Sequence, residues 1–310
     1  MARFKAYLPL VFAFLWSAGC GAQSNLSDSK STQFSATEKL NKRLTIGAVA
    51  LETSALVGLN QLWYADYPRQ SFHFYNDASN WQGMDKWGHA YSAYQLTRIL
   101  HEVFSSPSVQ SRKPMLKSAL FSASFMTAIE VMDGFSSEWG FSWGDMGANA
   151  AGLALYTVQQ SVFERSIISM KFSYRPSIYA EYRPSALGGN VLEQLFKDYN
   201  AQQYWLTYNS PAGGSKQGSL RWWKLLRPSI GFGAGGMLAG APDHPVYASY
   251  PAIRPHQRFM LSFDVDWQQV HVKRPWAKTA ITLLKAIKMP APTLIWMPNS
   301  GTFQLAPIYF

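Results

Sequence analysis

Four long stretches in the first half of the chain carry an apolar pattern that predicts helices. Ser105-Ser106-Pro107 ends the second stretch, and Pro114 suits the first turn of the third. Several of the stretches are rich in Ala, Gly, Ser and Leu, as expected of helices that pack closely. We therefore predict a four-helix bundle-like domain over residues 38–170. Its helices are expected at about 38–64, 84–104, 114–132 and 145–168.

The second half carries strand patterns instead. Between Arg258 and Trp267, apolar and polar residues alternate with a period of two, which indicates a β-strand. A glycine-rich stretch at 229–238 reads as another strand. A short helix is predicted at 191–199 and an amphipathic basic helix at 276–288. We expect 171–310 to form a smaller antiparallel sheet packed on the helices, which makes the fold class α+β.

The N-terminus indicates the compartment. Arg3 and Lys5 precede an apolar run at 7–16, and the small residues at 17–19 precede Cys20. This arrangement resembles a bacterial lipoprotein signal, with 1–20 as the signal, Cys20 as the site of lipid attachment and 21–37 as a flexible tether. An ordinary secretory signal cleaved near Gly19 or Ala22 is the alternative. Both interpretations place the protein outside the cytoplasm.

Charge changes the interpretation of the second half. Charged residues make up 15% of the chain, against roughly 25% in an ordinary soluble domain. Most of the net charge of +10 lies in 171–310, which holds fifteen Lys and Arg against six Asp and Glu. Because the chain is exported, we expect no nucleic acid partner; an anionic lipid or lipopolysaccharide surface fits this half. The candidate membrane-facing residues are Trp222, Trp223, Lys224, Arg227, Trp276, Lys278, Lys285 and Lys288.

Two interpretations of the helices remain open. One is a soluble or membrane-resting bundle held near a membrane by its lipid, and the other is a four-helix integral domain. Charged residues such as Glu52, Glu130 and Asp145 would each cost about 2.5–3.5 kcal/mol in lipid unless they face one another. This cost favours the first interpretation. The chain closes on Phe310 with a pattern that looks like the last strand of an outer-membrane barrel, but too few strands are visible for the eight or so that a closed barrel requires.

Polar residues gather at the ends of the predicted helices. Asp85 and His89, Glu130 and Asp133, and Asp145 and Asn149 form three pairs. The members of each pair lie three or four residues apart and therefore on one helix face. Such a group can form an acid/base site, a divalent-metal site or a buried hydrogen-bond network. Capping and helix-dipole effects can explain the same residues without chemistry. The candidates are Asp85, Lys86 and His89, then Glu130 and Asp133, then Asp145 and Asn149. No comparable group of polar residues surrounds the other histidines in the sequence, which are His73, His101, His244, His256 and His271.

These motifs resemble a known family. The pattern D-K-x-x-H, then E-x-x-D, then S-W-x-D-x-x-x-N-x-x-G is similar to the YfiM-type predicted periplasmic lipoproteins, a family of unknown function, over about residues 72–168. The segments at 72–77, 133–138 and 197–200 look like those of the longer, Bacteroidetes-type members. The order of the motifs is also similar to that in VanZ-like membrane proteins. The residues that carry the main pattern are Asp85, Lys86, His89, Glu130, Asp133, Ser142, Trp143, Asp145, Asn149 and Gly152.

The sequence thus predicts a cell-envelope lipoprotein of the periplasm or outer membrane, with a structural or interaction role at a membrane. The alternative is a hydrolase or transferase that acts on a lipid-linked or phosphorylated envelope substrate. In that case His89 would serve as acid/base, oriented by Asp85 or Glu130, and Lys86 would stabilise developing negative charge. The sequence assigns no cofactor, metal or protein partner.

Overall fold

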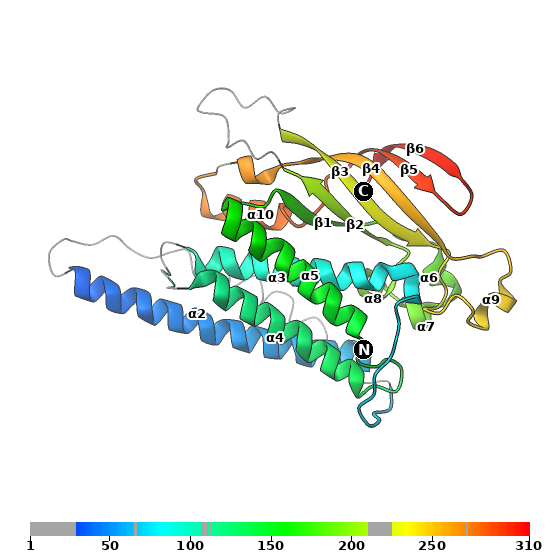
Figure 1. The fold of residues 1–310 in the computed structure, drawn as a ribbon, viewed down its shortest axis with the longest axis horizontal. Helices are drawn as coiled ribbons and strands as arrows, with labels where there is room; N and C mark the ends of the chain where they lie inside the picture. Colours follow the sequence, from blue (N-terminus) through cyan, green and yellow to red (C-terminus); the bar gives the residue numbers. More distant parts are fainter. Residues whose placement is uncertain are drawn as a thin grey trace.

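A computed structural model describes residues 29–64, 67–106, 109, 111, 113–209, 225–270 and 272–310. The fold is α+β, as predicted: long helices come first, and an antiparallel sheet of six strands follows. Figure 1 shows the long helices on one side of the molecule and the sheet on the other. The predicted signal and Cys20 lie outside the described residues.

Four long helices form the first layer. Helix α3 begins and ends where the sequence predicts, whereas α2 begins within the expected tether and α5 ends before its predicted limit. The α3 helix packs on both α4 and α5. In the described part of the chain, α4 is the one helix that is long and apolar enough to cross a membrane. The bounds are α2 Ser29–Leu59, continued by the π-helix η2 Asn60–Tyr64, then the 3-10 helix η3 Asn80–Gly83, α3 Met84–Phe104, α4 Pro114–Gly134 and α5 Trp143–Phe163.

A glycine allows α3 and α5 to approach closely. A Cβ atom built on Gly152 of α5 would lie 1.9 Å from the carbonyl oxygen of Ala90 in α3. No side chain fits at that distance, so the crossing requires glycine. The same crossing brings His89 of α3 and Asn149 of α5 within 3.2 Å of each other.

The strands follow one another in chain order, and each is antiparallel to the next. They are β1 Ile168–Tyr174, β2 Gln202–Tyr208, β3 Leu226–Gly235, β4 His256–Val265, β5 Ala291–Met297 and β6 Thr302–Tyr309. The sequence did not predict β1, β2 or β5. The shorter helices are α6 Tyr179–Tyr182, α7 Pro184–Leu187, α8 Val191–Lys197, α9 Val246–Ser249, the 3-10 helix η5 Trp267–Gln269 and α10 Pro275–Leu284.

The sheet curls around a buried interior that holds polar side chains as well as the apolar cluster of Trp205, Met260, Ile295 and Tyr309. Lys171 of β1 reaches Asp264 of β4 with 2.7 Å between Nζ and Oδ2, although two strands lie between them in the sheet. Both side chains are almost fully buried. Thr207 of β2 donates a hydrogen bond to the same carboxylate at 3.0 Å. The backbone of Phe172 in β1 also bonds to the segment 286–288, which precedes β5.

The opposite, outer face of the sheet carries one aromatic residue from each strand in register. This aromatic row consists of Phe172, Tyr204, Phe232, Phe259, Trp296 and Phe303, in the order of the strands. Helix α3 covers the first half of the row, where Tyr91 packs on Phe172 and Trp87 stacks on Phe232. The second half is open: Phe259 is 40%, Trp296 41% and Phe303 67% exposed.

Strand β4 shows which way the predicted alternation faces. Phe259, Leu261 and Phe263 are exposed, whereas Met260, Ser262 and Asp264, which alternate with them, are buried. The strand that the sequence predicts is present, and its aromatic face points away from the interior of the sheet. Successive side chains of a strand face opposite sides. The same alternation continues along β5, where Leu294 and Trp296 are exposed and Thr293 and Ile295 are buried.

Candidate functional site

Three helix ends meet at one place and bring the seven predicted polar residues together. The N-terminus of α3 supplies Asp85, Lys86 and His89, the C-terminus of α4 supplies Glu130 and Asp133, and the N-terminus of α5 supplies Asp145 and Asn149. Ser142 caps α5, since its hydroxyl accepts a hydrogen bond from the backbone N–H of Asp145 at 3.2 Å. We call these seven side chains, together with Asp77, the polar cluster.

Lys86 is the cationic centre of one side of the cluster. Its Nζ lies 2.6 Å from Asp145 Oδ1, 2.7 Å from Asp77 Oδ1 and 3.0 Å from Asp85 Oδ2. Burial by itself would lower the pKa of Lys86, but the carboxylates, with Asp85 foremost, hold the pKa above its usual value. Lys86 therefore stays charged and ties the loop before α3 to α5.

His89 connects the two sides of the cluster. Its Nδ1 lies 3.1 Å from Glu130 Oε1 and 3.2 Å from Asn149 Oδ1. Its Nε2 lies 3.8 Å from both Asp85 Oδ1 and Asp145 Oδ1. Burial opposes the charged imidazole, but the surrounding carboxylates, with Asp85 first, outweigh it and raise the pKa of His89.

The carboxyl groups do not all behave alike. Burial raises the pKa of Glu130 to about 8 and that of Asp133 to about 7. The pKa of Asp145 rises to about 7, mainly through burial and then through Asp85. Asp85 is the exception: although burial opposes it, His89 and Lys86 lower its pKa. Near neutral pH the cluster thus combines proton donors with proton acceptors, which is the requirement for acid/base chemistry.

The structure adds four residues that the sequence did not place in this group. Asp77 contacts Lys86 and accepts a hydrogen bond from Ser142 at 2.7 Å. The hydroxyl of Tyr64 donates to Asp133, and that of Tyr199 donates to Asp85, each at 2.6 Å. Asp77, Tyr199 and Ser142 lie in segments that carried the family resemblance, which was the available signal. Nothing in the sequence pointed to Tyr64.

Water reaches part of the cluster. The side chains of Lys86, Asp85 and His89 are 20%, 16% and 15% exposed, whereas Glu130 is fully buried. The edge of the cluster that carries Lys86 and His89 is therefore the part in contact with solvent. Glu130 can act only through His89 or Asn149, which it contacts.

The predicted membrane-facing residues that the structure describes do not form one surface. Lys288 is fully buried, with its Nζ 4.9 Å from the centre of the Trp205 ring, so the prediction that it faces a membrane is wrong: α10 ends at Leu284 and the chain turns inward. Lys285 pairs with Glu102 at 3.0 Å. Trp276 and Lys278 are exposed on α10, and Arg227 is partly buried on β3. Trp222, Trp223 and Lys224 lie outside the described residues.

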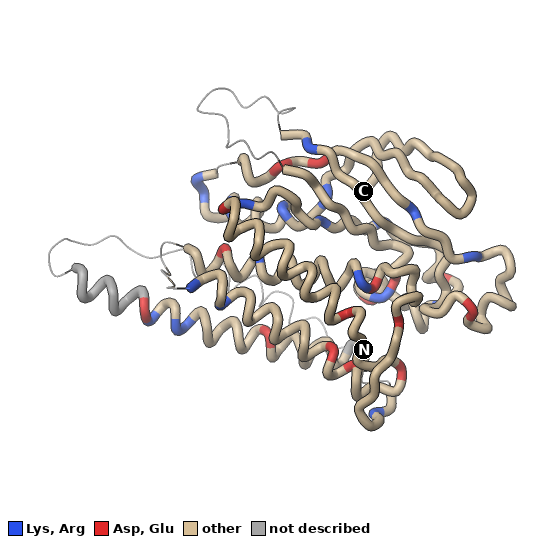
Figure 2. Tube along the Cα trace, viewed as in Figure 1, with Lys and Arg blue, Asp and Glu red and all other residues tan. Residues whose placement is uncertain are grey.

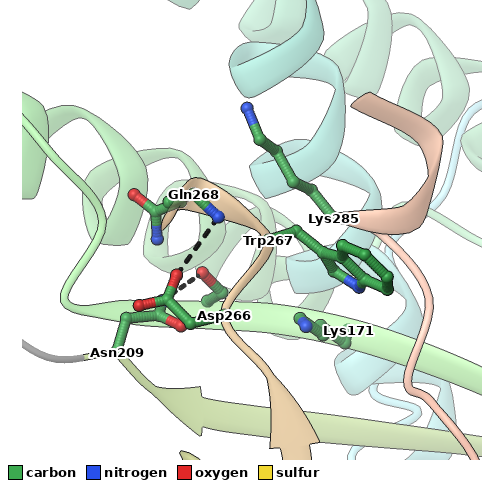
Figure 3. Close-up of a pocket in the computed structure, with 7 residues that line it drawn as sticks. Lys171, Asn209, Asp266, Trp267, Gln268 and Lys285 are labelled. Carbon is green, nitrogen blue, oxygen red and sulfur yellow. Dashed lines mark hydrogen bonds between the residues drawn. The ribbon is translucent and has the colours of Figure 1, made fainter. Parts of the chain in front are cut away.

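A small pocket at the end of the curled sheet is lined by residues that do not belong to the polar cluster. Figure 3 shows its lining, in which the backbone N–H of Gln268 donates to Asp266 Oδ1 at 3.2 Å. Its other lining residues are Ser169, Lys171, Asn209, Trp267 and Lys285. Of the remaining histidines, His101 bonds Tyr156 and His73 bonds the Gly134 carbonyl; neither joins the cluster, and His271 is not described.

Comparison with known families finds a match that covers the polar cluster. Residues 73–161 match the model of the family described as predicted periplasmic lipoprotein (DUF2279). This confirms the resemblance that the motifs indicated and supports a periplasmic lipoprotein. The similarity of motif order to VanZ-like proteins finds no support. No curated protein and no solved structure matches the chain.

Proposed function

We propose that this protein is a lipid-anchored envelope protein that keeps the open half of its outer sheet face in contact with a lipid bilayer. The observation that carries the proposal is the aromatic row. Helix α3 buries its first half, whereas Phe259, Trp296 and Phe303 remain exposed. An exposed apolar surface of this kind marks a site of interaction.

The chemistry of the surrounding strands favours lipid. Residues 289–310 contain no Asp, Glu, Lys, Arg or His, and β5 and β6 accordingly carry no blue or red in Figure 2. On these strands Leu305 is 69% and Ile308 77% exposed. Strands that contact lipid place apolar residues outward and polar residues inward, which is the arrangement around Ser262 and Asp264.

Charge and anchoring support the same location. The excess of Lys and Arg in 171–310 attracts anionic lipid headgroups, and the exposed Trp276 and Lys278 on α10 offer an aromatic and a basic side chain for the interface. The lipid expected on Cys20 would hold the sheet near the membrane.

Vesicle flotation of the full chain tests the proposal. Cys20→Ser removes the predicted lipid attachment, and vesicles of phosphatidylethanolamine and phosphatidylglycerol serve as the probe. Phe303→Ser with Leu305→Ser should weaken binding. Full burial of such a side chain contributes about 1.5–3 kcal/mol, and about two thirds of each is open, so the pair should cost about 2–4 kcal/mol, or roughly 30- to 1000-fold in affinity.

The control for this experiment is Val191→Ser on α8. Val191 is 73% exposed and belongs to α8 rather than to the open half of the aromatic row, so its replacement should leave vesicle binding unchanged. Equal binding by the sheet variant and the control would refute the lipid contact. Loss of binding in both would point to a general change in the protein.

A second candidate function rests on the polar cluster. The coexistence of a lowered pKa at Asp85 with raised pKa values at Glu130 and Asp145 favours an acid/base hydrolase or transferase of a phosphorylated or lipid-linked envelope substrate. His89→Gln should abolish turnover of such a substrate while His101→Gln on the same helix retains it. Equal activity of the two variants would exclude this role of His89.

A further inference from the structure

The surroundings of His89 define the direction of each ring nitrogen. Two acceptor oxygens lie next to Nδ1, from Glu130 at 3.1 Å and Asn149 at 3.2 Å. The Asn149 amide also donates to the same Glu130 oxygen at 3.4 Å, which fixes the amide with its oxygen toward the imidazole. A proton on Nδ1 satisfies these oxygens, so Nε2 is the nitrogen that points to the solvent side of the cluster.

The other nitrogen lies between two carboxylates at a distance that does not suit a hydrogen bond. Nε2 is 3.8 Å from Asp85 Oδ1 and 3.8 Å from Asp145 Oδ1. Hydrogen bonds require roughly 2.7–3.2 Å between these atoms. Bonds of about 2.0–2.2 Å from one metal ion to imidazole nitrogen and carboxylate oxygen place the two ligand atoms about 3–4 Å apart. One ligand atom from each of Asp85, His89 and Asp145 lies within 4.8 Å of the others.

A separate observation comes from Glu130, which is not part of this triangle. Its side chain is fully buried, and its Oε2 has no hydrogen-bond partner among the residues that the structure describes. Its other oxygen contacts the imidazole. A buried carboxylate is costly unless positive charge compensates it. In metal sites, a carboxylate in this position orients the histidine ligand through the nitrogen that does not bind the metal.

The charges around the triangle also favour a cation. Asp77, Asp85, Glu130, Asp133 and Asp145 supply five carboxyl groups, whereas Lys86 is the one lysine that contacts them in the described part of the chain. Lys86 contacts Asp85 through Oδ2, whereas Nε2 of His89 lies 3.8 Å from the other oxygen, Oδ1. At Asp145 the lysine and the histidine approach the same oxygen, Oδ1, so a metal ion there would share this atom with Lys86.

We propose that Asp85, His89 and Asp145 bind one divalent transition-metal ion, with Zn²⁺ as the fitting ion, and that Glu130 positions His89 for this ion. One imidazole nitrogen and two carboxylate oxygens suit zinc and leave a further coordination position for water or a ligand. The exposed edge of Lys86 and His89 gives the ion its access. The inference holds whether or not the sheet contacts lipid.

Titration of the metal-stripped full chain with Zn²⁺, followed by calorimetry, tests the site. We expect one equivalent of Zn²⁺ to bind per chain. His89→Gln should abolish this binding, and Glu130→Gln should weaken it by about 10- to 100-fold, the usual effect of an outer partner. His101→Gln is the matched control, because His101 lies on the same helix and bonds Tyr156 outside the cluster. It should bind like the wild type.

A spectroscopic readout separates metal binding from folding. Co²⁺ in place of Zn²⁺ should give visible ligand-field bands in the wild type and in His101→Gln, and none in His89→Gln, while circular dichroism reports whether each variant is folded. If a variant is unfolded, Asp145→Asn serves as the second ligand variant. Absence of saturable Zn²⁺ binding by the folded wild type, or binding unchanged in folded His89→Gln, would overturn the proposal.

Discussion

The contact between Gly152 and Ala90 allows a sharp prediction about stability. In Gly152→Ala the new Cβ would lie 1.9 Å from the Ala90 carbonyl oxygen and 2.7 Å from its carbonyl carbon. Ordinary contacts of this kind are longer than 3.4 Å, and both partners are helix backbone, so α3 and α5 must move apart. Overpacking of this type costs about 1–3 kcal/mol and outweighs the helix propensity that alanine adds.

Gly147→Ala is the control, because Gly147 lies on the same helix and its new methyl group would have nothing within 4 Å. Alanine there should stabilise the protein by about 0.5–1 kcal/mol. Urea unfolding of the two variants and the wild type, followed by circular dichroism, measures both effects. A Gly152→Ala protein as stable as Gly147→Ala would refute the claim that the crossing requires glycine.

Two further predictions concern the interior of the sheet. Asp264→Ala leaves Lys171 buried without its partner, so urea unfolding should show a free energy of unfolding lower by about 3–5 kcal/mol. Asp243→Ala, at an exposed position, is the control and should change the free energy of unfolding little. Equal losses in the two variants would contradict the importance of the pair. Burial lowers the pKa of Lys288 to about 8 from 10.5, so the unfolded chain holds more protons between these values and the Lys288 contribution to stability rises with pH across that window. Lys288→Met should therefore stabilise the protein more at pH 7 than at pH 10 relative to wild type, and an advantage that does not shrink with pH would be evidence against this assignment.

The sequence predicted elements best where their limits carried a signal. Helix α3 has Ser105-Ser106-Pro107 at its end, and its predicted limits match the structure. Helix α5 was extended too far, because no glycine or proline separates it from β1 at Ile168. Strand β2 has both faces buried, so its sequence lacks the alternation of apolar and polar residues that indicates a half-buried strand.

The side of the sheet that faces outward could not be predicted from alternation. A period of two shows that Phe259 and Ser262 belong to opposite faces, but not which face is buried. The answer depends on the distant partners that satisfy Ser262 and Asp264, such as Lys171 and Thr293. The polar cluster was easier, because the spacing of Asp85 and His89 fixes their common face within one helix. Tyr64 reaches the cluster only through tertiary packing.

The ion pair of Lys171 and Asp264 has a consequence for the order of folding. Neither charge can enter the interior alone without a large cost, so β1 cannot be completed before β4 is in place. Strand β1 follows α5 directly along the chain, whereas β4 comes much later. A chain shortened before β4 would leave Lys171 without its carboxylate, so β1 and β2 should not pair stably in it.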